Sequence, residues 1–204
     1  MSKFKVLHLC SGGHICGIAT YTNNLLKHFD DSCIHDFHEV PKKSVLSDLS
    51  KRQMMRVFDD FLERAKDYDA VHIQNEFGFF NGKFGLDFAQ KVFYKILKNL
   101  KKNKIKTFTT YHSEPIFYKA LGFLNFENKN SVRYWKKIAK LHQKKYNITA
   151  IVHTNPTKKI FKDTGFKNIE LVRHGVLERE LPKKFSLKEK EDFITLGIFG
   201  FISP

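Results

Sequence analysis

Short apolar runs alternate with longer segments of helical spacing along this chain. The short runs predict buried strands at residues 5–9, 70–73, 107–111, 150–152 and 170–172. Apolar positions at helical spacing predict helices at residues 18–28, 45–68, 84–99, 132–146 and 157–163. Alternating strands and helices favour an α/β fold with a Rossmann-like, doubly wound parallel sheet.

Helix boundary signals agree with this alternation. Asn103 and Gly165 each follow a helical segment, and both residue types commonly end helices. Pro156 stands where a proline starts a helix, since its missing N–H group is not needed in the first turn.

The pattern changes after residue 176. Residues 1–176 predict one Rossmann-like domain, and residues 177–192 are charged and aperiodic, as in an interdomain connector. Residues 193–199 predict another buried strand, which has no partner in the few residues that follow. Because a lone buried strand is poorly stabilised, we expect residues 193–204 to begin a second domain that continues beyond this sequence.

Composition narrows the class of protein. The 204 residues suffice for one well-packed domain, and 28% charged residues argue against a lipid-spanning chain. The first residues lack the long apolar segment of a secretory signal, so we expect a cytoplasmic protein, with peripheral contact at the inner face of the membrane as an option. The net charge of +15 indicates an anionic partner. No nucleic-acid module is recognisable, so we do not expect nucleic acid to be that partner.

Two stretches leave membrane contact open. Residues 84–104 combine an apolar stripe with lysines, a pattern that suits an acidic membrane surface and equally a core-packed helix. Residues 116–126 form an unusually aromatic connection, which would cover an acceptor, touch lipid or pack under the loop.

A glycine-containing loop joins the first predicted strand to the first predicted helix. Gly12 and Gly13 allow close backbone approach, and free N–H groups at a helix start favour phosphate. The spacing G-G-x-x-x-G differs from the dinucleotide fingerprint G-x-G-x-x-G. A ligand cradle and a tight turn that needs small residues therefore both remain open.

Polar side chains follow two predicted strands at the edge where open α/β sheets bind ligands. Gln74, Asn75 and Glu76 follow one strand, and His112 follows the next. A histidine suits proton transfer or polar contact with a hydroxyl, because its charge state is readily tuned near neutral pH. A single histidine at a strand end is often merely hydrogen-bonded, so that role stays open, but the nearby Glu76 and glycine loop make His112 the candidate catalytic residue.

The positions of the other histidines favour structural roles. His72 and His153 fall inside predicted strands, which favours hydrogen-bonded core residues. His174 closes the last strand of the domain, where it would face an interdomain cleft or, the favoured interpretation, lie in a plain turn. No H-E-x-x-H or C-x-x-C motif is present, so no metal site is expected.

Several segments together resemble the family 4 retaining glycosyltransferases of GT-B fold. They cover nearly the whole chain and occur in the family's order: GGHICGIATYTNNLLKHF, DAVHIQNEFGFF, TYHSEP, IVHTNPTKKIF, VRHGV and LGIFGFISP. The resemblance implies two Rossmann-like domains facing each other across a cleft. The N-terminal domain would hold the acceptor, and the C-terminal domain would hold the nucleotide-sugar, which is a co-substrate; no other cofactor is implied.

The resemblance also implies roles for individual residues. Gly12 and Gly13 would approach the donor diphosphate. His112 matches the histidine near the transferred sugar, where it would orient hydroxyls and support developing charge. Three residues would line the acceptor side: Tyr21, Asn75 and Glu76.

The family's diphosphate-stabilising basic residues and its two spaced glutamates belong to the second domain, and this chain ends before them. The expectation is therefore a hexosyltransferase-like enzyme that, when full length, moves a sugar with retention to the hydroxyl of a glycan or lipid-linked acceptor. The isolated chain should be inactive or nearly so. The alternative is a non-catalytic module that binds an anionic glycolipid, a membrane surface or a protein partner.

Overall fold

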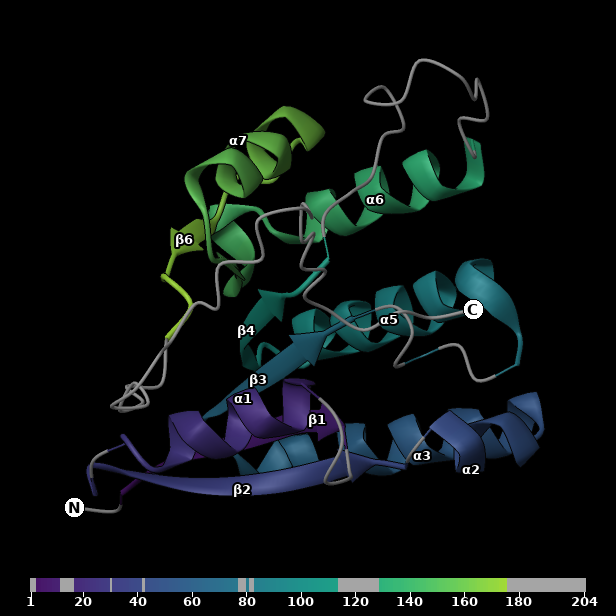
Figure 1. Ribbon diagram of the computed structural model, residues 1–204, viewed down its shortest axis with the longest axis horizontal. Coiled ribbons are helices and arrows are strands. Elements are labelled where there is room, and N and C mark those ends of the chain that lie inside the picture. Colours follow the sequence, from purple (N-terminus) through teal and green to yellow (C-terminus); the bar gives the residue numbers. More distant parts are fainter. Residues whose placement is uncertain are drawn as a thin grey trace, which may run out of the picture. The chain divides into compact units, whose positions relative to one another are not determined.

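A computed structural model describes residues 3–11, 17–29, 31–41, 43–76, 80, 83–113 and 129–175 (Figure 1). The chain divides into a unit of residues 1–174 and a unit of residues 175–204. The expected connector and the expected strand beyond it, residues 177–204, lie outside the described residues.

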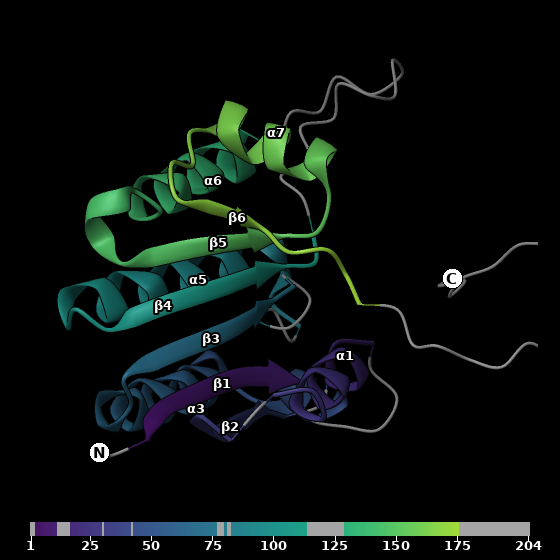
Figure 2. The ribbon, with the colours of Figure 1, turned by 90° about the vertical axis from the view of Figure 1, so that its left-hand side faces the viewer.

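The described residues form one six-stranded sheet in the order β2-β1-β3-β4-β5-β6, and every neighbouring pair is parallel (Figure 2). Its strands are β1 (Phe4–Ser11), β2 (Cys33–Val40), β3 (Ala70–Asn75), β4 (Lys106–Tyr111), β5 (Ile148–Val152) and β6 (Ile169–Leu171). The order steps outward in both directions from β1, as in a Rossmann-like doubly wound fold. The predicted fold class is confirmed.

Helices flank this sheet. They are α1 (Gly17–Leu26), α2 (Lys43–Asp48), α3 (Lys51–Arg64), α5 (Gly85–Lys102), α6 (Lys129–Leu141) and α7 (Asn155–Thr164). Short 3-10 turns at Ala65–Asp67 and Lys144–Tyr146 precede β3 and β5. The helices α3, α5 and α6 contact one another in sequence and lie side by side against the sheet (Figure 2).

All five predicted strands are present, and β2 is an addition. It pairs only with β1, at the edge of the sheet, and most of its residues are half-buried. Its sequence, CIHDFHEV, therefore carries polar side chains where a central parallel strand would carry apolar ones.

The predicted helix over residues 45–68 is wrong as a single element. The structure ends α2 at Asp48 and starts α3 at Lys51. Ser50 caps α3: its side chain accepts from the backbone N–H of Gln53, whose side chain accepts from the Ser50 backbone N–H in return. This capping box satisfies N–H groups that have no partner within a new helix, so a break is stable here.

The helix boundaries predicted from Asn103, Pro156 and Gly165 are confirmed, whereas the helix predicted over residues 132–146 ends earlier, at Leu141. Asn103 is the C-terminal cap of α5, and Pro156 lies in the first turn of α7. Gly165 ends α7 with a φ of 104°, a left-handed conformation that favours glycine.

The amphipathic stretch at residues 84–104 packs into the core. Helix α5 buries its apolar stripe: Ala89, Val92, Phe93, Ile96, Leu97 and Leu100. Its lysines lie on the remaining face, where Lys95 pairs with Asp59 of α3 at 2.9 Å. The core-helix interpretation of this stretch therefore accounts for its pattern. Among the described helices, none has the length and apolar content needed to cross a lipid bilayer.

Candidate functional site

Polar and aromatic side chains gather where β3, β4, β5 and β6 end, together with one residue of α1. The group comprises Tyr21, Gln74, Asn75, His112, His153 and His174. The carboxyl ends of all strands in a parallel sheet lie at one edge, so residues distant in sequence meet there.

His112 is held in place from two sides. It follows Tyr111, the last residue of β4, and its backbone N–H donates to the carbonyl of Asn75 at 3.0 Å. Its side-chain Nε2 lies 2.7 Å from Oε1 of Gln74, a geometry in which the imidazole N–H donates to the amide oxygen. The neighbouring strand β3 therefore fixes both the backbone and the ring of His112.

The imidazole of His112 is neutral at physiological pH. Burial, together with the nearby rings of His153 and His174, lowers the pKa of His112 to about 4. A neutral ring keeps one lone pair, so it can accept a hydrogen bond while its N–H donates another.

Tyr21 covers the histidines from helix α1. Its ring centroid lies 5.3 Å from that of His112, 5.7 Å from that of His153 and 4.6 Å from that of His174. The residue is half-buried, and burial raises the pKa of its phenol. Tyr21 is therefore an uncharged residue that joins α1 to the ends of three strands.

The prediction that His153 lies inside a strand is wrong. Strand β5 ends at Val152, so His153 is the first residue beyond it. Its Nδ1–H donates to the carbonyl of Val172 at 2.8 Å, which joins the segments after β5 and β6. His153 thus belongs to the carboxyl-edge group rather than to the core.

His174 also belongs to this group, although a plain turn was the favoured prediction for this residue. Its ring lies 4.9 Å from that of His153, by centroids, and the residue is exposed. Sequence reasoning missed this meeting because it depends on where β5 and β6 stop, and periodicity places strand ends poorly.

Three buried amide atoms at the end of β3 have no hydrogen-bond partner among the described residues. They are Nε2 of Gln74 and both Nδ2 and Oδ1 of Asn75. Gln74 contacts the ring of His112, whereas the side chain of Asn75 leaves the opposite face of the strand, because successive side chains alternate. Leaving such a group unsatisfied costs about 1–3 kcal/mol, so a buried donor or acceptor normally has a partner. These atoms are therefore suited to pair with the hydroxyls of a bound molecule or with water.

Three predicted site residues remain: Glu76, Gly12 and Gly13. Glu76 follows β3 and is exposed. Gly12 and Gly13, predicted to approach a diphosphate, lie outside the described residues, as does the aromatic segment 116–126.

A second histidine group lies within the sheet. His72 contacts Nδ1 of His8 at 3.2 Å and Oγ1 of Thr110 at 2.8 Å, and His8 contacts Nδ1 of His35 at 2.9 Å. His72 is therefore a hydrogen-bonded strand residue, as predicted. Burial is the main reason that the pKa of His72 falls to about 3 and that of His8 to about 4, so both rings are neutral.

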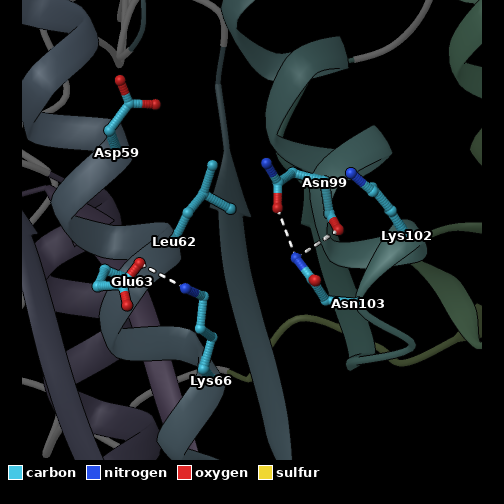
Figure 3. A pocket seen from close by; sticks show the side chains of 7 residues that line it. All are labelled: Asp59, Leu62, Glu63, Lys66, Asn99, Lys102 and Asn103. Atoms are coloured by element: carbon cyan, nitrogen blue, oxygen red, sulfur yellow. Dashed lines mark hydrogen bonds and ion pairs between the residues drawn. The ribbon is translucent and has the colours of Figure 1, made fainter.

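A separate hollow of about 320 Å³ lies between α3 and α5 (Figure 3). It is lined by Asp59, Leu62, Glu63, Lys66, Asn99, Lys102 and Asn103. These residues come from the helix ends that precede β3 and β4, at the amino edge of the sheet. Charges of both signs line it, and Lys66 pairs with the exposed Glu63 at 2.6 Å, so it resembles a solvated interhelical groove more than a ligand site.

Comparison with known proteins adds no assignment. No protein-family model matches the chain, and a search of curated proteins finds no relative. The glycosyltransferase family therefore stays a prediction, and function must be argued from the carboxyl-edge residues.

Proposed function

We propose that this chain is the acceptor-side domain of a retaining glycosyltransferase. The enzyme would move a sugar from a nucleotide-sugar to a hydroxyl of a glycan or lipid-linked acceptor. The observation that carries the proposal is a neutral His112 held by the amide of Gln74, whose buried Nε2 lacks a partner among the described residues.

A polyhydroxylated ligand fits these groups chemically. Nε2 of Gln74 offers N–H donors that have no partner among the described residues. Each sugar hydroxyl can both donate and accept, so a hydroxyl beside His112 can accept from Nε2 of Gln74. Binding would then supply a hydrogen bond to a buried donor that lacks a partner among the described residues.

His112 would orient a hydroxyl near the reacting centre. Its Nε2–H is engaged by Gln74, so the ring is held in one orientation. A preorganised dipole of this kind stabilises developing charge without reorganising during the reaction. Because the pKa of His112 is about 4, the ring acts as a neutral hydrogen-bonding group near pH 7 and not as a cationic acid.

The donor would be held mainly by a following domain, as the family resemblance implies. Stabilisation of a departing diphosphate is usually a major part of such catalysis. We therefore expect this chain alone to turn over nucleotide-sugar poorly or not at all.

The test compares two preparations, the chain of 204 residues and the protein with whatever its gene encodes beyond Pro204. Each is incubated with a panel of nucleotide-sugars, and release of nucleoside diphosphate is measured with and without glycan and lipid-linked acceptors. We expect turnover by the longer protein only, with a transferred sugar of retained anomeric configuration.

A different result would favour the binding-module alternative. If the longer protein turns over no nucleotide-sugar and the chain binds vesicles containing anionic lipid, the transferase proposal fails. Vesicles of neutral lipid serve as the matched control, since attraction of a basic protein to a surface depends on lipid charge.

A further inference from the structure

Three histidines at the carboxyl edge present ring nitrogens to one another. One ring nitrogen from each of His112, His153 and His174 lies within 4.8 Å of the other two. They follow three different strands, β4, β5 and β6, so the sheet itself sets their separation.

The hydrogen bonds of two of these rings leave a lone pair on a defined nitrogen. Since Nδ1 of His153 donates to the carbonyl of Val172, its Nε2 is the unprotonated nitrogen. That Nε2 atom is buried and has no hydrogen-bond partner among the described residues. In His112, donation from Nε2 to Gln74 leaves the lone pair on Nδ1.

We propose that His112, His153 and His174 bind a divalent transition-metal ion of the zinc class. Neutral imidazole is a preferred ligand of Zn²⁺, and three protein ligands with one open position describe many zinc sites that bind a further molecule. Ligating histidines usually donate their second ring N–H to a carbonyl or carboxylate, which fixes the tautomer. Val172 supplies such a carbonyl to His153, and the Gln74 amide oxygen serves His112 in the same way.

The distances between the ring nitrogens allow metal binding after small movements of the side chains. A tetrahedral ion with bonds of about 2.0–2.1 Å holds its ligands roughly 3.3 Å apart. Side-chain rotations of the half-buried His153 and the exposed His174 can close the remaining gap without moving the strands. No sequence motif indicated this site, because its ligands lie far apart in the chain.

The site does not depend on the proposed sugar transfer, because three imidazoles can bind an ion whatever reaction this edge of the sheet serves. An ion on Nδ1 of His112 would occupy the lone pair that the proposed transfer offers to a hydroxyl, so the two uses of this atom exclude each other at any one time. The test of the metal site is a direct measurement of binding. The untagged chain is stripped with a chelator and titrated with Zn²⁺ by calorimetry, and with Co²⁺ while visible absorption is recorded. We expect about one ion per chain, and cobalt bands of the intensity given by four- or five-coordinate sites.

Single variants separate this site from adventitious binding. His174→Ala removes the most exposed ligand, so the fold should persist, which circular dichroism checks; Zn²⁺ affinity should fall at least about 10-fold. His153→Ala should have a similar effect. His28→Ala, which removes an exposed histidine of another region, should leave affinity within about 2-fold.

Two results would overturn the proposal. One is the absence of saturable Zn²⁺ binding by the folded chain at micromolar concentration. The other is an affinity that His174→Ala and His28→Ala change equally, since the ion would then bind dispersed surface histidines.

Discussion

The ring of Tyr21 stands edge-on to the imidazole of His112, with 5.3 Å between the ring centroids and 81° between their planes. This contact joins α1, which follows the first strand, to the end of β4 in the middle of the sheet. The same ring also meets His153 and His174, so one side chain closes the carboxyl-edge group over three strand ends.

Replacing Tyr21 should therefore separate packing from hydrogen bonding. Tyr21→Ala removes ring contacts with three imidazoles and should lower the free energy of unfolding by about 1–2 kcal/mol. Tyr21→Phe keeps the ring and should change it by less than about 0.5 kcal/mol. Urea denaturation measures both. Equal losses in the two variants would show that the hydroxyl, and not the ring, secures α1.

The cap of α3 gives a second stability prediction. Ser50→Ala removes the oxygen that accepts from the Gln53 backbone N–H and should cost about 1 kcal/mol. Ser50→Gly, which keeps a favourable cap conformation, should cost only a few tenths of a kcal/mol. Chemical denaturation compares the pair. A glycine variant as destabilised as the alanine variant would contradict a capping role.

The break at Ser50 also shows what the sequence could have predicted. Apolar spacing continues from α2 into α3, so periodicity alone predicts one helix over residues 45–68. A serine followed three residues later by glutamine is the sequence pattern of a capping box, and Ser50 and Gln53 form one at the start of α3. The boundary was readable from local chemistry, although not from hydrophobic pattern.

Strand β2 and the histidine group show two different limits. Strand β2 lies at the sheet edge, where it buries little apolar surface, so its sequence is polar. No run of apolar residues therefore predicts it. His112 follows a strand rich in threonine and aromatic residues, which favour strands, and could be placed at the carboxyl edge from sequence. His153 and His174 could not, because their meeting depends on the exact ends of β5 and β6.

A buried histidine should make stability depend on pH. His142 is fully buried, its Nε2 lies 2.9 Å from the hydroxyl of Tyr111, and burial lowers its pKa from 6.5 to about 3. Below pH 6.5 the unfolded chain binds a proton at this residue and the folded chain does not. The stabilising contribution is therefore complete above pH 6.5 and is lost by about 1.4 kcal/mol per unit as the pH falls toward 3.

His142→Gln removes this titration and keeps an acceptor for Tyr111. Urea unfolding at several pH values between 7.5 and 4 should show a shallower decline for the variant, by about 1.4 kcal/mol per pH unit below 6.5. The other buried histidines titrate in both proteins, so their contributions cancel in the difference. Parallel curves would mean that His142 is protonated in the folded protein.

Two further predictions concern the proposed reaction and are measured on a preparation that turns over nucleotide-sugar. His112→Ala should lower kcat by about 100-fold or more, while nucleotide-sugar affinity changes by less than about 3-fold. The reason is that the ring would act on a hydroxyl at the reacting centre, and the donor nucleotide would be held elsewhere. Equal loss of turnover and affinity would place His112 in ground-state binding.

Gln74→Leu tests whether His112 must be held in place. The variant removes the amide oxygen 2.7 Å from Nε2 of His112 but leaves the imidazole itself, so it should lower kcat less than His112→Ala does. In the double variant the Gln74 substitution should add little, because Gln74 acts through a ring that is no longer present. Fully additive losses would mean that Gln74 contacts the substrate independently. The series is then repeated after chelator treatment. A loss of turnover that comes from the missing imidazole should persist when all proteins are metal-free. A difference that comes from lost metal should disappear.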